Sequence, residues 1–405
     1  MSIDEANKTN TPMSSDDLPE KLAGLNAASH LRSISSAPLS ASRSAKGLLI
    51  NRAALTRIGS PRVFFYFAII TVLLAVAIIT GIAAGSMSIA PGTVLRVLGL
   101  HLLPDGWVTA SPVSDAENAV VWLIRTPRVI TAALVGAALA IAGAQMQGLF
   151  QNPLASPDIV GTSSGGALGA VFALATGLAT RSLFYIPVFS FVGALVALFV
   201  VYGVATQRGR TPIASLLLAG VALNSMIGAA TTFIITMSWV RLEVAQEIIF
   251  WLLGGLDSRT WQHVWFAGPL VALGILISLI YSRDLDLLLM GEDTASSLGV
   301  EVEHVKRVVL TNSALLTGAA VAISGVVGFV GLVVPHIVRL LIGPAHRQLI
   351  PASALTGAAF LILADLLART LHRPEEIRLG IITAVFGAPF FLYLLMRRRR
   401  EIGYL

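Results

Sequence analysis

Long runs of apolar residues, separated by short polar segments, make up most of this chain after about residue 60. An α-helix of about 20 apolar residues crosses roughly 30 Å of hydrocarbon, so each run predicts one membrane span. Ten runs fit this description: 63–84, 129–148, 158–178, 185–206, 213–237, 262–281, 306–326, 327–342, 350–371 and 379–396. The stretch 308–342 also fits one long span followed by a re-entrant piece. The pattern therefore predicts an all-α polytopic membrane protein with about ten transmembrane helices.

One eight-residue string occurs twice, as GAALAIAG at 136–143 and as GAAVAISG at 318–325, with six identical letters at an offset of 182. Small residues allow close helix packing in any membrane protein, so the strings alone are weak evidence for a repeat. Further matches at this offset are Asn152-Pro153 with Val334-Pro335, and Gly161 with Gly343. The two copies begin five spans apart and so cross in opposite directions. We predict an inverted repeat of spans 2–5 and 7–10, an arrangement typical of transporters.

The composition agrees with a membrane protein, since 55% of the residues are hydrophobic, 12% are charged and the mean hydropathy is +0.80. One soluble core of this length could not bury so much apolar surface. The chain has no cysteine, which excludes disulfides, Fe–S clusters and thiolate metal sites. The net charge of +6 might suggest nucleic acid, but most of the excess cations lie beside spans, where cytoplasmic Lys and Arg belong. We expect no nucleic-acid partner.

The distribution of these cations predicts the orientation of the chain. Fifteen Lys and Arg near span ends share a face with the N-terminus, and nine lie on the other face. Both termini are therefore predicted to be cytoplasmic, which requires an even number of spans. Residues 1–60 are basic and poor in large apolar side chains, and we predict a disordered cytoplasmic tail. Residues 61–405 form the predicted membrane domain.

A short acidic helix is predicted in the cytoplasmic segment 283–307, over Glu292 to Leu298. Gly291 opens it and Gly299 closes it, and its first residues are carboxylates, which the positive end of a helix dipole favours. Such a helix could be a contact for another protein or an ordinary amphipathic loop helix. The composition favours neither alternative.

Three arginines lie on the predicted outer face, where cations are rare: Arg125, Arg128 and Arg369. They suit an acidic soluble partner that docks on this face. Alternatively they bind lipid phosphates, or pair with Asp365, Glu375 and Glu376. For Arg128 and Arg369 we favour docking.

Polar residues also occur at membrane depth, where they either join helices or mark a transport path. They are Gln145, Gln147, Asn152, Asn224, His336 and Asp365, with Pro153 and Pro335 beside two of them. For any single residue, joining helices is the safer interpretation. His336 follows Pro335 and is predicted to cap a helix break rather than to bind metal, because no second ligand stands at a metal-site spacing.

Several motifs are absent from the sequence. It has no GxxxxGK[ST] phosphate loop, no ladder of arginines and no cluster of buried carboxylates. The chain therefore does not bind nucleotide through such a loop, sense voltage or relay protons. The energy for transport must come from elsewhere.

Several strings together resemble the permease subunits of type II ABC importers, the group that takes up iron chelates, haem and cobalamin. The matching strings are RTPRVITAALVGAALAIAGAQMQGLFQNPLASPDIVGTSSGGALGAV (125–171), LLLAGVALN (216–224), FWLLGGLDSRTW (250–261), GEDTASSLGV (291–300), SGVVGFVGLVVPHIVRLLIGPAHR (324–347) and ADLLARTLHRPEEIRLGIITAVFGAPFFLYLL (364–395). The resemblance covers about residue 60 to the C-terminus, and the motifs are specific only as a set.

This resemblance implies a ten-helix permease in the cell membrane that works as a homodimer, with the path between the two copies. The partners would be two cytoplasmic ATPase subunits, which carry the ATP and Mg, and an extracytoplasmic binding protein. The chain itself would hold no cofactor or metal and would catalyse no reaction. The arginines Arg125, Arg128 and Arg369 would meet acidic residues of the binding protein. The helix that couples to the ATPase would comprise Gly291, Glu292, Asp293, Thr294, Ala295, Ser296, Ser297, Leu298 and Gly299.

Three departures from the family pattern weaken any inference about the substrate: the long tail, Gly254-Gly255 after WLL, and Gln151 before NPLA, where Arg is common. On family frequency we predict an iron chelate, either a ferric siderophore or haem, with cobalamin as the alternative.

An ion-coupled secondary carrier, which also uses inverted repeats, is the rival function. Only Asp158 and Asp365 could serve it, both near predicted span ends. A signalling subunit would need a sensory domain, for which the tail is too polar and too short.

Overall fold

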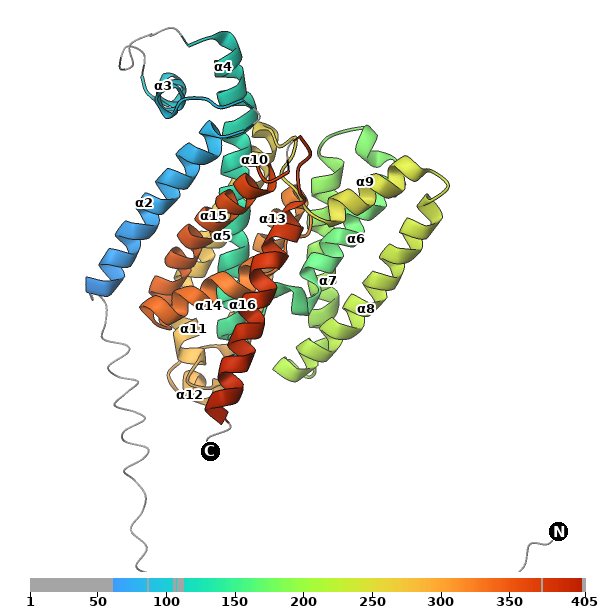
Figure 1. The fold of residues 1–405 in the computed structure, drawn as a ribbon. Coiled ribbons are helices and arrows are strands. Elements are labelled where there is room, and N and C mark those ends of the chain that lie inside the picture. Colours follow the sequence, from blue (N-terminus) through green and yellow to red (C-terminus); the bar gives the residue numbers. More distant parts are fainter. Residues whose placement is uncertain (1–60, 86, 105–106, 108–112, 373, 403–405) are drawn as a thin grey trace, which may run out of the picture. The chain divides into compact units, whose positions relative to one another are not determined.

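The computed structural model describes residues 61–402 except 86, 105–106, 108–112 and 373. The tail predicted over 1–60 lies outside the described residues. The described chain is helical throughout, with no strand (Figure 1). Its α-helices are α2 (Pro61–Ala83), α3 (Pro91–Leu102), α4 (Asp115–Ala119), α5 (Thr126–Leu149), α6 (Thr162–Ala175), α7 (Tyr185–Ala205), α8 (Ile213–Ser238), α9 (Leu242–Leu252), α10 (Trp261–Ile280), α11 (Ser282–Leu288), α12 (Glu292–Ser297), α13 (Val302–Ser324), α14 (Val330–Ile342), α15 (His346–Ala368) and α16 (Leu379–Ile402).

Each of the ten predicted spans is a helix, but their lengths differ. Seven of the described helices are long and apolar enough to cross a membrane, and three apolar helices are shorter: α6, α14 and the apolar part of α16. The third and eighth predicted spans correspond to α6 and α14, which have only 14 and 13 residues. At 1.5 Å per residue each covers only about 20 Å, less than the hydrocarbon thickness.

Local backbone geometry explains where these two short helices begin. Gly161, with φ of +83°, immediately precedes α6. Gly325 and Phe329, with φ of +67° and +68°, interrupt the apolar run between α13 and α14. Glycine adopts such left-handed conformations without a steric penalty. The stretch 308–342 is therefore one long helix followed by a separate short one.

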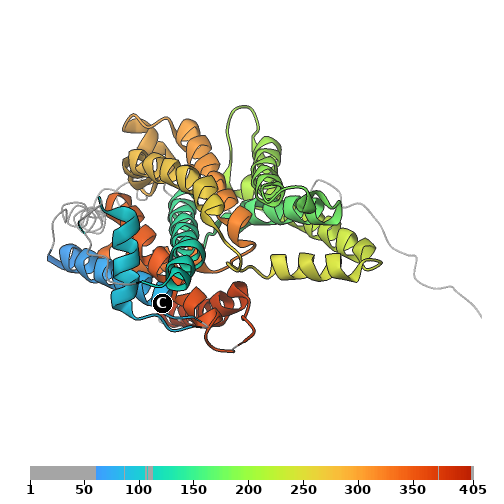
Figure 2. The same cartoon turned by 90° about the horizontal axis from the view of Figure 1, so that it is seen from above.

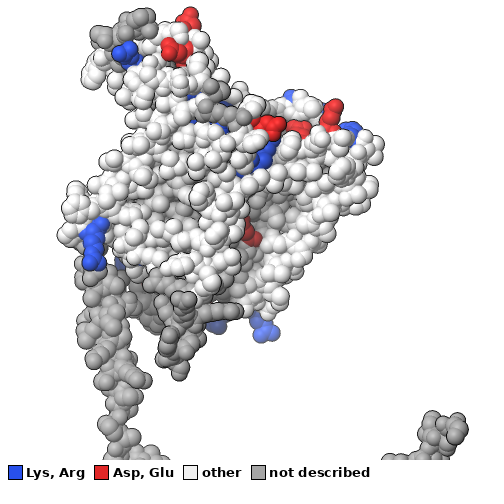
Figure 3. Space-filling model, in the orientation of Figure 1, with Lys and Arg blue, Asp and Glu red and all other residues white. Residues whose placement is uncertain are grey.

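Helices α5 and α13 form the centre of the molecule (Figures 1 and 2). Most of α5 is buried, and it packs against α10, α13, α14 and α15. Charged side chains gather toward the two ends of the molecule and are sparse on the surface between them (Figure 3). This distribution agrees with a membrane belt around the middle.

The predicted inverted repeat is present at the level of whole helices. Helix α5 packs against α14 and α15, just as α13 packs against α6 and α7, and α5 and α13 run in opposite directions (Figure 1). Outside the two repeated strings, residues 182 positions apart do not occupy equivalent places in the structure. Pro153 lies in a turn whereas Pro335 lies inside α14, and Gly161 precedes α6 whereas Gly343 follows α14. The similarity of these four positions is therefore not structural.

The repeated string in α5 serves as a close-packing surface. A Cβ atom built on Gly136 would lie 2.1 Å from the carbonyl oxygen of Gly357 in α15. One built on Gly143 would lie 1.8 Å from that of Gly331 in α14. Only a hydrogen fits in either place, so these glycines let the backbones of α14 and α15 touch that of α5.

We predict that Gly136→Val prevents normal packing of α5 on α15, because the added atoms would overlap the α15 backbone. The expected loss is at least about 2 kcal/mol of unfolding free energy. Gly228→Ala in α8 is the control, since no atom lies within 4 Å of a Cβ at that position. Thermal unfolding in detergent measures both, and an unchanged midpoint for Gly136→Val would contradict the packing argument.

Candidate functional site

The short acidic helix predicted in the cytoplasmic segment is α12, at the opposite end of the molecule from α4 (Figure 1). Gly291 and Gly299 flank it with φ of +104° and +89°, and Glu292 and Asp293 stand in its first turn. It is one residue shorter at its end than predicted. A helix of six residues is not stable alone in water, so tertiary contacts must hold α12 in place.

A buried lysine provides these contacts. Lys306 of α13 is 2% exposed, and its Nζ lies 2.7 Å from Glu292 Oε2 and 3.1 Å from Glu303 Oε1. It also donates to the carbonyl of Thr211, at 3.2 Å, in the turn between α7 and α8. Glu303 in turn accepts the backbone N–H of Thr211 at 3.0 Å. One cation thus ties α12 to α13 and to the residues that precede α8.

The two sides of α12 differ in exposure. Ala295 is fully buried against the rest of the chain. Leu298 is 59% exposed, and Met290, just before the helix, is 41% exposed. An anchored helix that presents exposed apolar side chains is suited to contact another protein.

Two further contacts fix α11, the helix that leads to α12. Asp286 accepts hydrogen bonds from the backbone N–H of His346, at 2.8 Å, and pairs with its Nδ1 at 2.7 Å. Gln151, at the end of α5, donates to the carbonyl of Leu288 at 2.7 Å. Sequence reasoning missed Lys306, Asp286 and His346. In the sequence, Lys306 was only one of many predicted cytoplasmic cations. Its position three residues after Glu303 on one predicted helix could have indicated an ion pair.

On the outer face, two of the predicted docking arginines bind the end of α2. Arg125 donates to the carbonyls of Ile82 and Ala83 at 2.9 and 2.8 Å, and also to Met87. Arg369 donates to Ala84 at 3.1 Å and to Gly81. Both arginines are less than 10% exposed. They satisfy the carbonyls that the last turn of a helix leaves without partners, and their charge faces the negative end of its dipole.

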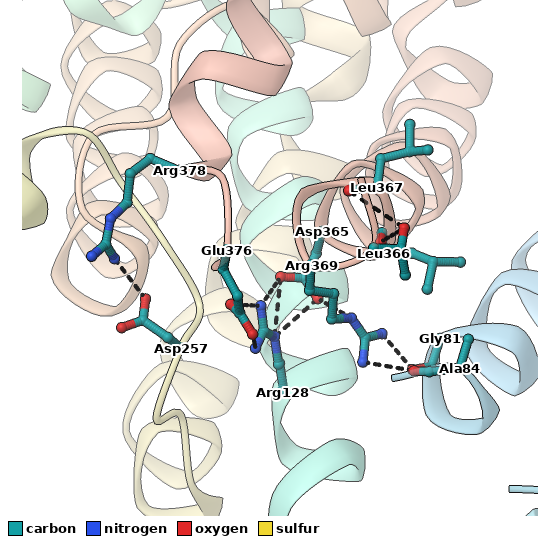
Figure 4. A network of polar contacts seen from close by, with 11 residues as sticks. Gly81, Ala84, Arg128, Asp257, Asp365, Leu366, Leu367, Arg369, Glu376 and Arg378 are labelled. Atoms are coloured by element: carbon teal, nitrogen blue, oxygen red, sulfur yellow. Dashed lines mark hydrogen bonds and ion pairs between the residues drawn. The ribbon is translucent and has the colours of Figure 1, made fainter. Parts of the chain in front are cut away.

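The third arginine, Arg128, pairs with two acids (Figure 4). Its guanidinium lies 2.8 Å from Asp365 and 2.8 Å from Glu376. Asp365 also faces Arg369 at 3.4 Å. Arg128 and Arg369 therefore pair within the chain, Arg128 with Asp365 and Glu376 and Arg369 with Asp365, as the alternative expected. Docking through these three arginines stays a prediction.

The polar residues at membrane depth mostly join helices. Gln145 donates to Ser278 at 3.0 Å, and Asn312 donates to the same hydroxyl at 2.9 Å. Asn224 donates to the carbonyl of Asp158 at 3.0 Å. Asn152, beside Pro153, accepts the backbone N–H of Leu154 at 3.0 Å in a turn after α5.

The prediction that His336 caps a helix break is wrong. Pro335 and His336 lie inside α14, because the break comes earlier, at Gly325 to Phe329. Pro335 has no N–H to give the carbonyl four residues before it, that of Gly331. Gln147 of α5 compensates by donating to Leu332 at 3.0 Å and more weakly to Gly331 at 3.5 Å. The described residues hold no group of three potential metal ligands.

Comparison with known proteins agrees with this arrangement. The model of the FecCD transport family matches residues 73–397. The chain belongs to the FecCD transport family. It is a multi-pass permease of the ABC importer type that handles metal chelates and vitamins.

The names of relatives in this family refer to different substrates. The cobalamin import permease of Halobacterium salinarum is 47% identical over 72% of this chain and 76% of its own length. The hemin transport permease of Yersinia pestis is 41% identical over 69% of this chain and 84% of its own length. The Fe(3+) dicitrate permease of Escherichia coli K12 is 38% identical over 76% of this chain and 96% of its own length.

A solved structure confirms the fold. It is described as an inward-facing conformation of a metal-chelate type ABC transporter. It matches 82% of this chain and 99% of its own chain, with a TM-score of 0.71 and 31% identity.

We predict that Asp365→Asn weakens the outer end of this FecCD permease, because it removes the charge that faces both Arg128 and Arg369. Breaking such a buried pair should cost about 3 kcal/mol of unfolding free energy. Glu376→Gln is the control, since the Glu376 side chain is 40% exposed and should cost less than about 1 kcal/mol. Equal thermal midpoints for the two variants in detergent would contradict this assignment.

Proposed function

We propose that this permease lies in the cell membrane with both termini in the cytoplasm, and that two copies enclose the transport path. An extracytoplasmic binding protein delivers a metal chelate to the end that holds Arg125, Arg128 and Arg369. Two ATPase subunits bind the end that holds α12 and supply the energy. The single observation that carries this proposal is α12, a short helix anchored on one side by buried Ala295 and exposing Leu298 on the other.

The coupling proposal follows from how α12 is held. Its anchors are a buried alanine and an ion pair to Lys306, so a push on α12 also moves the groups bound to Lys306. Those groups lie at the start of α13 and in the turn before α8. We propose that residues 291–299 act as a lever between the ATPase and these two helices rather than as a ligand site.

The arginine contacts change what we propose for docking. Arg125 and Arg369 satisfy backbone carbonyls at the end of α2, and Arg128 satisfies two carboxylates. Releasing any of them would leave buried polar groups without partners, which is costly. We therefore propose that the three arginines hold the surface on which the binding protein docks and do not themselves leave their internal partners.

The substrate we propose is a bulky metal chelate. The prediction from family frequency is an iron chelate, either a ferric siderophore or haem. The 47% identity to a cobalamin permease supports the cobalamin alternative, while 41% and 38% identity to hemin and ferric citrate permeases support the iron chelate. These differences are too small to choose between the two substrates.

We predict that Leu298→Asp uncouples ATP hydrolysis from transport, because a carboxylate would replace the apolar contact with the ATPase. In proteoliposomes, ATP-driven uptake should fall at least about tenfold, equivalent to about 1.4 kcal/mol of lost coupling. Insertion into the membrane should not change, since Leu298 is 59% exposed.

Two controls accompany this experiment. Leu298→Met keeps an apolar contact and should retain uptake. Arg62→Asp places a carboxylate at another exposed position, at the start of α2, and should also retain it. Normal ATP-driven uptake by Leu298→Asp would count against the lever. Sodium- or proton-driven uptake by the chain without any ATPase would instead support the ion-coupled carrier.

The substrate is tested on the partner binding protein. We expect this protein, isolated with its ligand, to show the absorbance spectrum of a haem or a ferric siderophore. A corrinoid spectrum would establish the cobalamin alternative and contradict the iron chelate. Uptake of the same compound by the reconstituted permease, ATPase and binding protein would then confirm the assignment.

A further inference from the structure

Arg259 is a partly buried arginine at the outer end of the described chain that differs from Arg128, Arg369 and Arg378 in its partners. It lies in the loop between α9 and α10, its side chain is partly buried, and its Nε is shielded from water. Among the described residues, no carboxylate lies within ion-pair distance of it, and its Nε has no hydrogen-bond partner. By contrast, Arg128 and Arg369 face Asp365, and Arg378 faces Asp257 at 3.2 Å.

Among the residues that the structure describes, Arg259 makes one polar contact, and its geometry is poor. Its Nη1 lies 3.4 Å from Nε2 of His263. The Nδ1 of His263 accepts the backbone N–H of Thr260 at 3.2 Å. A neutral histidine whose Nδ1 accepts a hydrogen bond carries its hydrogen on Nε2, so Nε2 cannot accept one from Arg259. The guanidinium therefore keeps unused donors.

Arg259 lines a pocket of about 400 Å³ on the outer side of the chain. The pocket lies between α9, the loop 253–260 and the residues just before α16. Phe250 and Arg378 form one wall, with the Arg378 guanidinium 4.5 Å from the centre of the Phe250 ring. The pocket is therefore a built cavity that combines an aromatic surface with two cations.

The acids around this pocket do not neutralise Arg259. Asp257 already pairs with Arg378. Glu243 and Glu247 of α9 line the pocket but are exposed to water. Burial lowers the pKa of the Arg259 guanidinium, the charge of Asp257 opposes this change, and that of Arg128 adds to it. An arginine remains charged despite such a shift. A shielded charge without a partner is unfavourable, and an anion that reached it would recover the lost interaction.

We infer that this pocket binds a carboxylate group, held by the guanidinium of Arg259. A carboxylate matches the planar donor pattern of a guanidinium and would use the Nε that is now unpartnered. The inference deepens the proposed function, because the carboxylate would come from an acidic side chain of the binding protein or from a carboxylate-bearing chelate. The Phe250 ring would contact the apolar part of either ligand.

The test uses the complete permease–ATPase complex in nanodiscs, with Arg259→Gln as the variant. Two probes are titrated: the partner binding protein without ligand, and ferric citrate as a chelate that carries carboxylates. We expect Arg259→Gln to weaken binding of one probe about tenfold to hundredfold, because a charge-assisted pair is lost. Loss confined to the binding protein assigns the carboxylate to that protein. Loss confined to ferric citrate assigns it to the chelate.

Matched variants separate a binding role from a structural one. Arg181→Gln removes an exposed cation from another outer loop and should leave both affinities unchanged. Arg259→Lys keeps the charge without the planar donors and should fall between wild type and Arg259→Gln. Unchanged affinity of Arg259→Gln for both probes would overturn the inference. If the wild-type complex binds no binding protein at all, the proposed function fails instead.

Discussion

The constraint that shapes this molecule is that polar backbone groups must find partners where water is scarce. Such groups arise, among other places, at the end of α2, at the proline inside α14 and at the breaks before α6 and α14. Side chains from other helices satisfy the first two. Arg125 and Arg369 bind the last carbonyls of α2, and Gln147 binds carbonyls near Pro335. The polar residues of the membrane region therefore mainly stabilise the fold.

This constraint also supports the proposal that the molecule transmits a movement from α12. Helices α5, α14 and α15 meet through glycines that allow backbone contact, so they move together as one packed block. Ion pairs join helices at both ends of the described chain. At the cytoplasmic end Lys306 joins α12 to α13 and to the turn before α8. At the outer end Asp365 joins α5 to α15 through Arg128.

Much of the fold could be predicted from the sequence, because apolar runs and glycine-flanked acidic segments are local signals. The ten helices and α12 follow from them. The lengths of α6 and α14 could not be predicted, since hydropathy does not reveal that Gly161 and Phe329 adopt left-handed backbone conformations. The partners of Arg125 and Arg369 depend on the meeting of α2 with α5 and α15, more than 280 residues apart in the case of Arg369. The predicted position of an arginine outside the membrane suggested that its charge was available to a partner. The packing of the helices instead determines which arginines already have a partner within the chain.

At the outer end, the internal contacts of the arginines change the prediction of which arginine binds another molecule. Arg125, Arg128 and Arg369 were expected to recognise acids of a partner, and the sequence did not single out Arg259. The structure separates them by what they already bind. Arg128 and Arg369 share Asp365, Arg378 has Asp257, and Arg259 has neither a carboxylate nor a good hydrogen bond among the described residues. A cation that already has an acid partner must break that pair before it can bind another, so its net gain is small. Arg259 makes no such exchange, and recognition at this end should therefore depend on it more than on the arginines that hold the helices together.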